Sequence, residues 1–210
     1  MTTTSEANGS GGRAGGERPS RAQRLLLGAI LILALAGVAT SMELTRIHYL
    51  THTDPSFHSV CAVSETVNCE TVAQSPYSVF LGLPISIWGM VAFLAFAVLA
   101  GWGLTRRRLH EGWPAGLLFA AAVVAAGVSG LMGWISYVRI DALCLFCMTL
   151  YCLSGLLLPV TGALLWVRRA GPLRALVADL GGIVRRPVLP LSLLVLAGAA
   201  LGVPRALIQP

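Results

Sequence analysis

Residues 80–104 read FLGLPISIWGMVAFLAFAVLAGWGL, a run of 25 residues without one charged side chain. An α-helix rises about 1.5 Å per residue, so about 20 mainly apolar residues cross the roughly 30 Å of hydrocarbon in a bilayer. The stretch is long enough and apolar enough to predict a transmembrane helix. It places the chain among integral membrane proteins.

The rest of the 210-residue chain has the same character. It is 56% hydrophobic and 11% charged, with a mean hydropathy of +0.77, which excludes an ordinary soluble domain. Four further stretches approach the length of a span, namely residues 25–42, 113–138, 142–167 and 188–203. The last is the weakest because Pro190 and Pro204 stand close to its ends. We therefore predict an all-α integral membrane protein.

The polar segments divide the chain. Residues 1–24, rich in Gly, Ser, Thr and Arg, cannot bury a core and are expected to be a disordered cytoplasmic tail. Residues 25–167 are expected to form a four-helix bundle in which residues 43–79 make a long outer loop between the first two helices. Residues 168–187 are expected to be a basic cytoplasmic linker. Residues 188–210 are expected to form a fifth transmembrane helix with a short outer C-terminus.

Arginine carries the orientation signal, because all 15 basic residues are Arg. With a cytoplasmic N-terminus, 12 of them lie inside, and only Arg46, Arg139 and Arg205 lie outside. With Asp and Glu counted, the inner face carries +8 and the outer face −2. The sequence predicts a multi-pass inner-membrane protein with its long loop in the periplasm. The net charge of +6 therefore indicates orientation within membrane lipid and no nucleic-acid partner.

An alternative interpretation makes residues 25–39 a secretory signal peptide. An Arg-rich flank, an apolar run and Ala34-Leu35-Ala36 fit its general form. The apolar run continues to Met42 without a polar break, however, and the tail before it is long for such a signal. A first membrane span is therefore favoured.

Four of the five cysteines fall on the predicted outer side. Cys61 and Cys69 are spaced C-x7-C in the loop, and Cys144 and Cys147 form a C-x2-C motif at the start of the fourth span. An oxidising outer compartment permits disulfides. The loop pair could be a static staple and the helix pair inert buried thiols. Together, two such pairs on one side indicate an electron relay by thiol–disulfide exchange.

The C-x2-C motif begins a helix, where unpaired backbone N–H groups and the helix dipole favour a thiolate. Helical spacing aligns Cys144, Cys147 and Tyr151 in one stripe that runs inward by about 10 Å. A thiol and a phenol would then face the same apolar space. Cys152 points about 140° away from Cys147 and is expected to be a packing residue.

An ordered set of motifs runs from the loop to the fourth span: Cys61-x7-Cys69, Ser75 six residues later, Gly82-Leu83-Pro84, Ser86-Ile87-Trp88-Gly89 and Cys144-x2-Cys147-x3-Tyr151. As a set, these motifs resemble the vitamin K epoxide reductase family. The resemblance covers residues 42–156 and the flanking helices, more than half of the chain.

The resemblance implies a membrane thiol–disulfide oxidoreductase whose four helices surround a quinone beneath the outer loop. Cys144 and Cys147 would reduce the quinone, with Cys147 next to the ring. Cys61 and Cys69 would pass electrons from a thioredoxin-fold partner, with Cys69 exchanging with Cys144. The expected enzyme generates disulfides in that partner.

The resemblance also implies the rest of the site. Ser75 and Tyr151 would lie near the quinone, with Tyr151 hydrogen-bonded to a ring carbonyl. The quinone, of the menaquinone, ubiquinone or vitamin K type, would be a co-substrate, and no metal is expected. Phe80, Trp88 and Trp134 are candidates to line an apolar quinone pocket, although Trp also belongs at membrane boundaries.

Two departures from the family pattern narrow the expectation. Animal members carry an Asn in the stretch entering the second helix, where this chain reads Leu83-Pro84-Ile85, so quinone reduction is preferred over epoxide reduction. Many bacterial members continue into a fused thioredoxin domain, whereas this sequence stops at Pro210. We therefore expect a separate periplasmic thioredoxin-fold (Dsb-type) thiol oxidase as the partner.

Three alternatives remain. A second kind of quinone-linked disulfide oxidase carries its C-x2-C in the first outer loop, the reverse of the order here. A non-enzymatic membrane scaffold with structural disulfides would use the same cysteines without turnover. A metal or haem binder would use His48 and His52, which could share a helix face, while His58 is expected to be solvated.

Overall fold

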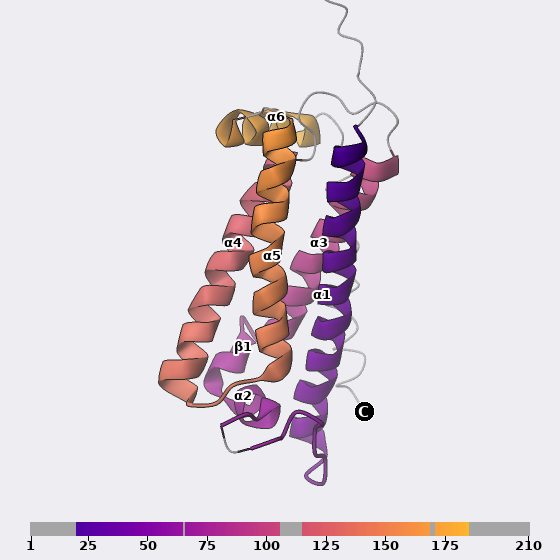
Figure 1. Cartoon of the computed structure of the whole chain (residues 1–210). Helices are drawn as coiled ribbons and strands as arrows, with labels where there is room; N and C mark the ends of the chain where they lie inside the picture. Colours follow the sequence, from indigo (N-terminus) through magenta and orange to yellow (C-terminus); the bar gives the residue numbers. More distant parts are fainter. Residues whose placement is uncertain (1–19, 65, 106–114, 169–170, 185–210) are drawn as a thin grey trace, which may run out of the picture.

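The computed structural model describes residues 20–64, 66–105, 115–168 and 171–184. The long helices of this part are α1 (Arg21–Thr53), α3 (Ile85–Thr105), α4 (Ala115–Ile135) and α5 (Leu145–Val167). They run side by side as a bundle (Figure 1). Each is long and apolar enough to cross a membrane, α4 together with the turn that extends it. The prediction of an all-α membrane protein is confirmed.

α1 is the helix around which the bundle is organised. It packs against both α3 and α5, and α4 packs on the other side of α5. The buried side of α1 recurs every three or four residues, as expected for one face of a helix; it comprises Leu27, Ile30, Ala34, Gly37, Ser41, Leu44 and Ile47. Residues 25–42 thus contribute to the core, which favours a span of the bundle over a cleaved leader.

α1 is longer at both ends than the sequence predicts. It begins at Arg21, because Ser20 and Gln23 form a capping box that satisfies both of their backbone N–H groups. It continues to Thr53, so the outer loop predicted to begin at residue 43 begins only at residue 54. At 33 residues, α1 is about 50 Å long, more than a bilayer core requires.

Polar residues do not end α1, since the helix accommodates them. Glu43 and Arg46 form an ion pair at 3.1 Å one turn apart. The hydroxyls of Thr45, Thr51 and Thr53 donate to the carbonyls four residues earlier at 2.7–3.0 Å. Polar residues at these positions therefore indicate where the helix leaves the apolar layer. They do not indicate the start of a loop.

The segment between α1 and α3 carries short elements: α2 (Cys69–Gln74), a 3₁₀ turn η1 (Pro76–Ser78), and the strands β1 (Val79–Phe80) and β2 (Leu83–Pro84). The strands pair antiparallel through a two-residue turn in which Leu81 and Gly82 have φ values of 54° and 77°. Two successive positive φ values are typical of a type I′ hairpin turn. The second span therefore begins at residue 85 and not at residue 80.

The turn between α4 and α5 is irregular. A π-helical turn, η2 (Ser136–Ile140), extends α4, and Asp141 then adopts a left-handed conformation with φ 53°. The Ser136 hydroxyl stabilises this reversal by donating to the Ala142 carbonyl at 2.6 Å. α5 consequently begins at Leu145, three residues later than the predicted fourth span, and Cys144 precedes it.

Residues 168–187 were predicted to be a linker, but α6 (Pro172–Val184) is a helix that lies across one end of the bundle against α4 (Figure 1). Asp179 of α6 is 1% exposed, and its Oδ2 accepts the N–H of Leu117 at 3.0 Å. A carboxylate is favoured at the N-terminus of a helix, where N–H groups lack partners. Through this contact α6, which belongs to the segment expected to be a linker, packs against the bundle.

Two predictions lie outside the described residues. They are the disorder of residues 1–19 and the fifth span, residues 188–203. Below, the end of the bundle that carries residues 54–84 is called the loop end, and the opposite end, where α6 lies, is called the α6 end (Figure 1).

Candidate functional site

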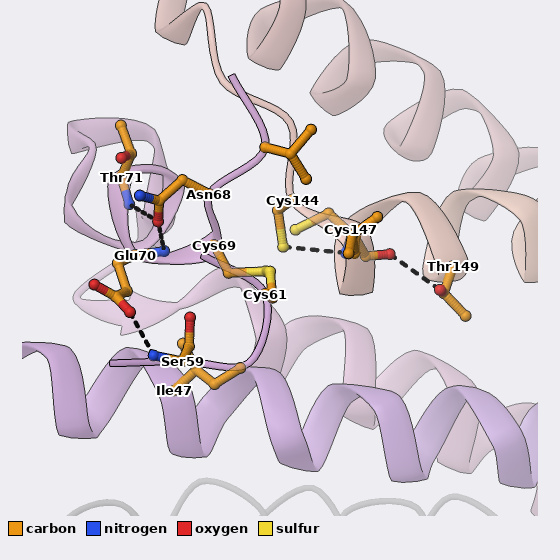
Figure 2. The surroundings of a disulfide bond; sticks show 12 residues. Ile47, Ser59, Cys61, Asn68, Cys69, Glu70, Thr71, Cys144, Cys147 and Thr149 are labelled. Atoms are coloured by element: carbon orange, nitrogen blue, oxygen red, sulfur yellow. Dashed lines mark hydrogen bonds between the residues drawn. A yellow bond between two sulfur atoms is a disulfide. The ribbon is translucent and has the colours of Figure 1, made fainter. Parts of the chain in front are cut away.

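Cys61 and Cys69 form a disulfide at the loop end, with their Cα atoms 5.6 Å apart. Both residues are buried, at 1% and 0% exposure. Cys69 is the first residue of α2, and the Asn68 side chain caps this helix by accepting the N–H groups of Glu70 and Thr71 at 2.9 and 3.3 Å. The cap orients the start of α2, so that the disulfide lies beside the start of α5 (Figure 2).

Glu70 forms a second link between the two ends of the loop that the disulfide closes. Its Oε1 accepts the backbone N–H of Ser59, and its Oε2 lies 3.9 Å from Nδ1 of His58. The carboxylate thus joins the segment before Cys61 to the residue after Cys69 (Figure 2). The loop is held by polar contacts as well as by its disulfide.

Backbone hydrogen bonds dock the loop on the segment that precedes α5. The N–H of Leu143 donates to the Thr66 carbonyl at 2.8 Å, and the N–H of Asn68 donates to the Leu143 carbonyl at 3.0 Å. Val67 and Leu143 therefore form a short parallel β-bridge. No sulfur takes part in it, so the bridge positions the next residue, Cys144, independently of the redox state of the loop.

Cys144 is the N-cap of α5 and is not inside the helix as predicted. Its backbone is extended, with φ −103° and ψ 122°, and its Sγ accepts the N–H of Cys147 at 3.3 Å. The hydrogen bond from the Cys147 side chain, with backbone N–H groups of Cys147 and Phe146, lowers the pKa of the Cys144 thiol below its ordinary value, although burial opposes this. Cys144 is the more nucleophilic position.

Three sulfur atoms meet at this point. The Sγ atoms of Cys61, Cys69 and Cys144 all lie within 4.8 Å of one another, and Cys144 is 1% exposed. Figure 2 shows the Cys144 thiol directed at the disulfide. A buried thiol of lowered pKa beside a disulfide has the arrangement required for thiol–disulfide exchange.

Cys147 and Tyr151 continue from Cys144 toward the bundle interior. Both are half-buried and lie one turn apart on α5. Tyr151 lines an open, mainly apolar cavity of about 520 Å³ between α4 and α5. Its other lining residues are Ala126, Ser129, Gly130, Gly133, Tyr137, Leu143, Met148 and Gly155. The space suits an apolar ring or chain, because glycine and alanine leave it open.

The other candidate quinone residues lie elsewhere at the loop end. Ser75 ends α2, where its hydroxyl donates to the Val72 carbonyl at 2.8 Å. Phe80 and Trp88 stack edge to face with centroids 6.1 Å apart, and Trp88 Nε1 donates to the Phe80 carbonyl at 3.1 Å. Neither these residues nor Trp134, which is 57% exposed, line the cavity beside Tyr151. Their role with quinone stays a prediction.

The prediction for Cys152 is half right. It faces away from the site as expected, but it is exposed and not packed, because α1 and α4 cover other faces of α5. His48 and His52 do share a helix face, with ring centroids 4.5 Å apart, and the Nδ1 of His52 bonds the His48 carbonyl at 2.7 Å. Among the described residues, the group able to offer three metal ligands is the cysteine cluster and includes neither histidine.

Sequence reasoning missed the residues that assemble the site. Asn68 could have been found, since Asn immediately before Cys-Glu-Thr is a helix-cap pattern. Glu70 and the Val67–Leu143 bridge carry no local signal, because their partners are distant in the sequence.

Residues 28–162, more than half of the chain, match the model of the vitamin K epoxide reductase family. This match includes both cysteine pairs, the whole of α3 and α4, and most of α1 and α5. The chain belongs to the vitamin K epoxide reductase family. As a member, it is a redox enzyme of the membrane, and the family suggests thiol–disulfide oxidoreduction as its chemistry. Cys61, Cys69 and Cys144 all lie inside the matched region.

Proposed function

We propose that this vitamin K epoxide reductase family member generates disulfides by passing electrons through its two cysteine pairs to a quinone. The carrying observation is that Cys144 Sγ lies within 4.8 Å of both sulfurs of the Cys61–Cys69 disulfide. A thiolate at Cys144 can reach either sulfur with a small movement, so a mixed disulfide can form without rearranging the bundle.

The proposed cycle begins at the loop. A dithiol on a separate thioredoxin-fold partner reduces Cys61–Cys69 and leaves with a new disulfide. The loop dithiol then reduces a Cys144–Cys147 disulfide through a mixed disulfide of Cys69 and Cys144. The state described here, with the loop pair oxidised and the helix pair reduced, follows that transfer. Each exchange moves two electrons and two protons.

The quinone accepts two electrons and two protons from the thiols of Cys144 and Cys147, and these two residues form their disulfide again. We assign Cys147 as the thiol nearest the quinone, because it lies one turn deeper on α5 than Cys144. Tyr151 would donate a hydrogen bond from its hydroxyl to a ring carbonyl, from the wall of the apolar cavity. Ser75, Phe80 and Trp88 would line the approach from the hairpin side.

The arginine distribution supports an orientation for this cycle. Arg21 and Arg24 begin α1 at the α6 end, whereas the loop end holds Arg46 and Arg139 among acidic groups. By the positive-inside rule, the α6 end would face the cytoplasm and the cysteine cluster the periplasm of an inner membrane. The partner would then be a periplasmic, Dsb-type thiol oxidase.

The decisive experiment follows quinone absorbance while the purified protein oxidises a reduced thioredoxin-fold partner. Changing Cys61, Cys69, Cys144 or Cys147 singly to Ala should lower the turnover rate at least about 100-fold, because the sulfur of each residue forms a disulfide bond in the relay. Cys152→Ala should retain wild-type rates as the matched control. Full activity in Cys147→Ala would refute the proposal.

A structural scaffold is the competing function. It does not account for a buried thiol of lowered pKa beside a disulfide. Thiol trapping in cells separates the two, since a structural bridge stays fully oxidised. A relay should instead shift toward reduced cysteines when quinone synthesis is blocked.

A further inference from the structure

The same three sulfurs lie close enough together to form a metal site once the bond between Cys61 and Cys69 is reduced and these two sulfurs separate. Zinc–thiolate bonds of about 2.3 Å at tetrahedral angles place neighbouring sulfurs about 3.8 Å apart. The Sγ atoms of Cys61, Cys69 and Cys144 already lie within 4.8 Å of one another. Movements of about 1 Å would bring three reduced cysteines to coordination distance.

The cluster would persist after the loop disulfide is reduced. The Leu143 and Asn68 backbone hydrogen bonds hold the loop on the start of α5 at 2.8 and 3.0 Å, and neither involves a cysteine. Glu70 ties the Ser59 backbone to α2 across the base of the loop. Reduction therefore frees two thiols without removing the contacts that gather all three.

The surroundings suit a soft cation. All three residues are at most 1% exposed, so a bound ion would be shielded from competing water. The N-cap position of Cys144 stabilises thiolate, the form that binds metal. Thiolate ligands select Zn²⁺ and similar ions over the hard cations Mg²⁺ and Ca²⁺.

We propose that Cys61, Cys69 and Cys144, when all three are reduced, form a thiolate site for a soft divalent cation, represented by Zn²⁺, whose occupation blocks the relay. Binding releases the proton of each ligand that is still a thiol and transfers no electrons. The three thiolates are the protein ligands, and the Cys147 thiol, which hydrogen-bonds the Cys144 sulfur, lies outside this group of three sulfurs. The loop disulfide abolishes the site by removing two of its thiols. The site rests on the cysteine geometry alone, and only its effect on turnover rests on the proposed function.

A competition titration tests the site directly. Purified full-length protein, reduced with a phosphine, is titrated with Zn²⁺ against a coloured chelator, and the oxidised protein serves as the folded control. We expect the reduced protein to bind one Zn²⁺ at least about 100-fold more tightly than the oxidised protein, because oxidation removes two of three ligands. Equal binding by both forms overturns the proposal.

Single substitutions identify the ligands. Cys61→Ser, Cys69→Ser and Cys144→Ser should each raise the Kd for Zn²⁺ at least about tenfold, whereas Cys152→Ser should leave it unchanged. Co²⁺ substitution gives a second readout, since its sulfur-to-metal absorption should weaken in the same three variants. Binding that survives all three changes, or that depends on Cys152, contradicts the site.

Cys147→Ser separates this inference from the proposed function. This variant should lose quinone reduction while keeping Zn²⁺ affinity within about threefold of wild type, because it retains all three ligands. If quinone reduction is never observed but the reduced protein binds Zn²⁺ as described, the metal site stands and the relay fails. If turnover is observed and Zn²⁺ does not inhibit it, the blocking role fails.

Discussion

At the residue scale, the chemistry of Cys144 depends on the groups around one sulfur atom. The hydrogen bond from the Cys147 side chain and two backbone N–H groups favour the thiolate, while burial disfavours it. The hydrogen bonds prevail, so the pKa is lowered. In the exposed, unstructured state the same thiol would titrate at about 8.5. The surroundings of Cys144 in the folded protein therefore favour its thiolate more than those of an ordinary cysteine do.

This difference predicts a pH dependence. The thiolate of Cys144 is present above its lowered pKa and is lost as pH falls through it, so mixed-disulfide formation with the loop should slow with a midpoint lower than that of an ordinary thiol. Replacing Cys147 removes the principal hydrogen-bond donor. In Cys147→Ala the midpoint should move upward, whereas Cys147→Ser, which keeps a hydroxyl donor, should stay lower than the Ala variant.

The measurement is the rate at which the Cys144 mixed disulfide accumulates, followed by mass spectrometry across a pH series in chelator-treated buffer. Both variants lack the thiol that would resolve the mixed disulfide toward Cys144–Cys147, whereas the released Cys61 thiol can still reverse its formation, so each time point is quenched with acid before analysis. Identical midpoints in the Ala and Ser variants would show that the Cys147 side chain does not set the pKa.

At the element scale, the two ends of the bundle are closed by contacts between helix termini and their neighbours. At the loop end, Asn68 caps α2 while the Val67–Leu143 bridge positions the N-cap of α5. At the α6 end, Asp179 accepts the N–H of Leu117 in the first turn of α4. At the α6 end an orphan helix N–H, which must find a partner when buried, determines where α6 docks, whereas at the loop end the docking depends on backbone hydrogen bonds outside the helices.

Gly116 offers a test of the α6 contact. A Cβ at this position would overlap the backbone of Ala175 and Leu176, which cannot move aside as a side-chain tip can. Gly116→Ala should therefore displace α6 and destabilise the protein by about 1–3 kcal/mol. Gly127→Ala, on the same helix, meets nothing within 4 Å and should be neutral or stabilising by up to about 1 kcal/mol.

The readout is labelling of an Ala175→Cys reporter in a Cys152→Ala background, because residue 175 is 3% exposed only while α6 is docked. Labelling should become faster with Gly116→Ala and stay unchanged with Gly127→Ala, and detergent melting temperatures should follow the same order. Equal labelling in all three proteins would mean that α6 tolerates the added methyl group.

At the scale of the whole molecule, the charge distribution and the position of the cysteine cluster bear on which side of the membrane each end of the bundle faces. The loop end carries both cysteine pairs. Of the arginines in the described part of the chain, four lie at the α6 end and two at the loop end, namely Arg21, Arg24, Arg168 and Arg174 against Arg46 and Arg139. If the α6 end is cytoplasmic, electrons enter the relay from the oxidising side of the membrane, where protein disulfides are made.

Sided labelling tests this orientation with one exposed position from each end, Tyr77 at the loop end and Leu173 on α6. In a Cys152→Ala background, Tyr77→Cys should react with an impermeant maleimide on intact spheroplasts. Leu173→Cys should react only after permeabilisation. The parent without an added cysteine should label weakly, since its remaining cysteines are bonded or largely buried. The opposite pattern would place the relay on the cytoplasmic side.

The membrane class, the four helices and the ordered cysteine motifs are determined by the sequence itself. Each depends on local composition or fixed spacing, since span length follows from bilayer thickness and helical periodicity places Cys147 and Tyr151 on neighbouring turns. The distribution of Arg also predicts an orientation, which sided labelling would test. Boundaries were less accurate, because hydropathy reports where a chain leaves the apolar layer and not where its helix ends, as the extension of α1 to Thr53 shows.

Only the tertiary structure decided which groups act on one another. The contact of Cys144 with the loop disulfide, the Leu143 bridge and the docking of Asp179 on α4 join residues that are far apart in the sequence. Such contacts arise when packing buries unpaired N–H groups and thiols together and leaves them only one another as partners. Local sequence specifies the helices and the reactive residues, whereas packing determines that three sulfurs share one site.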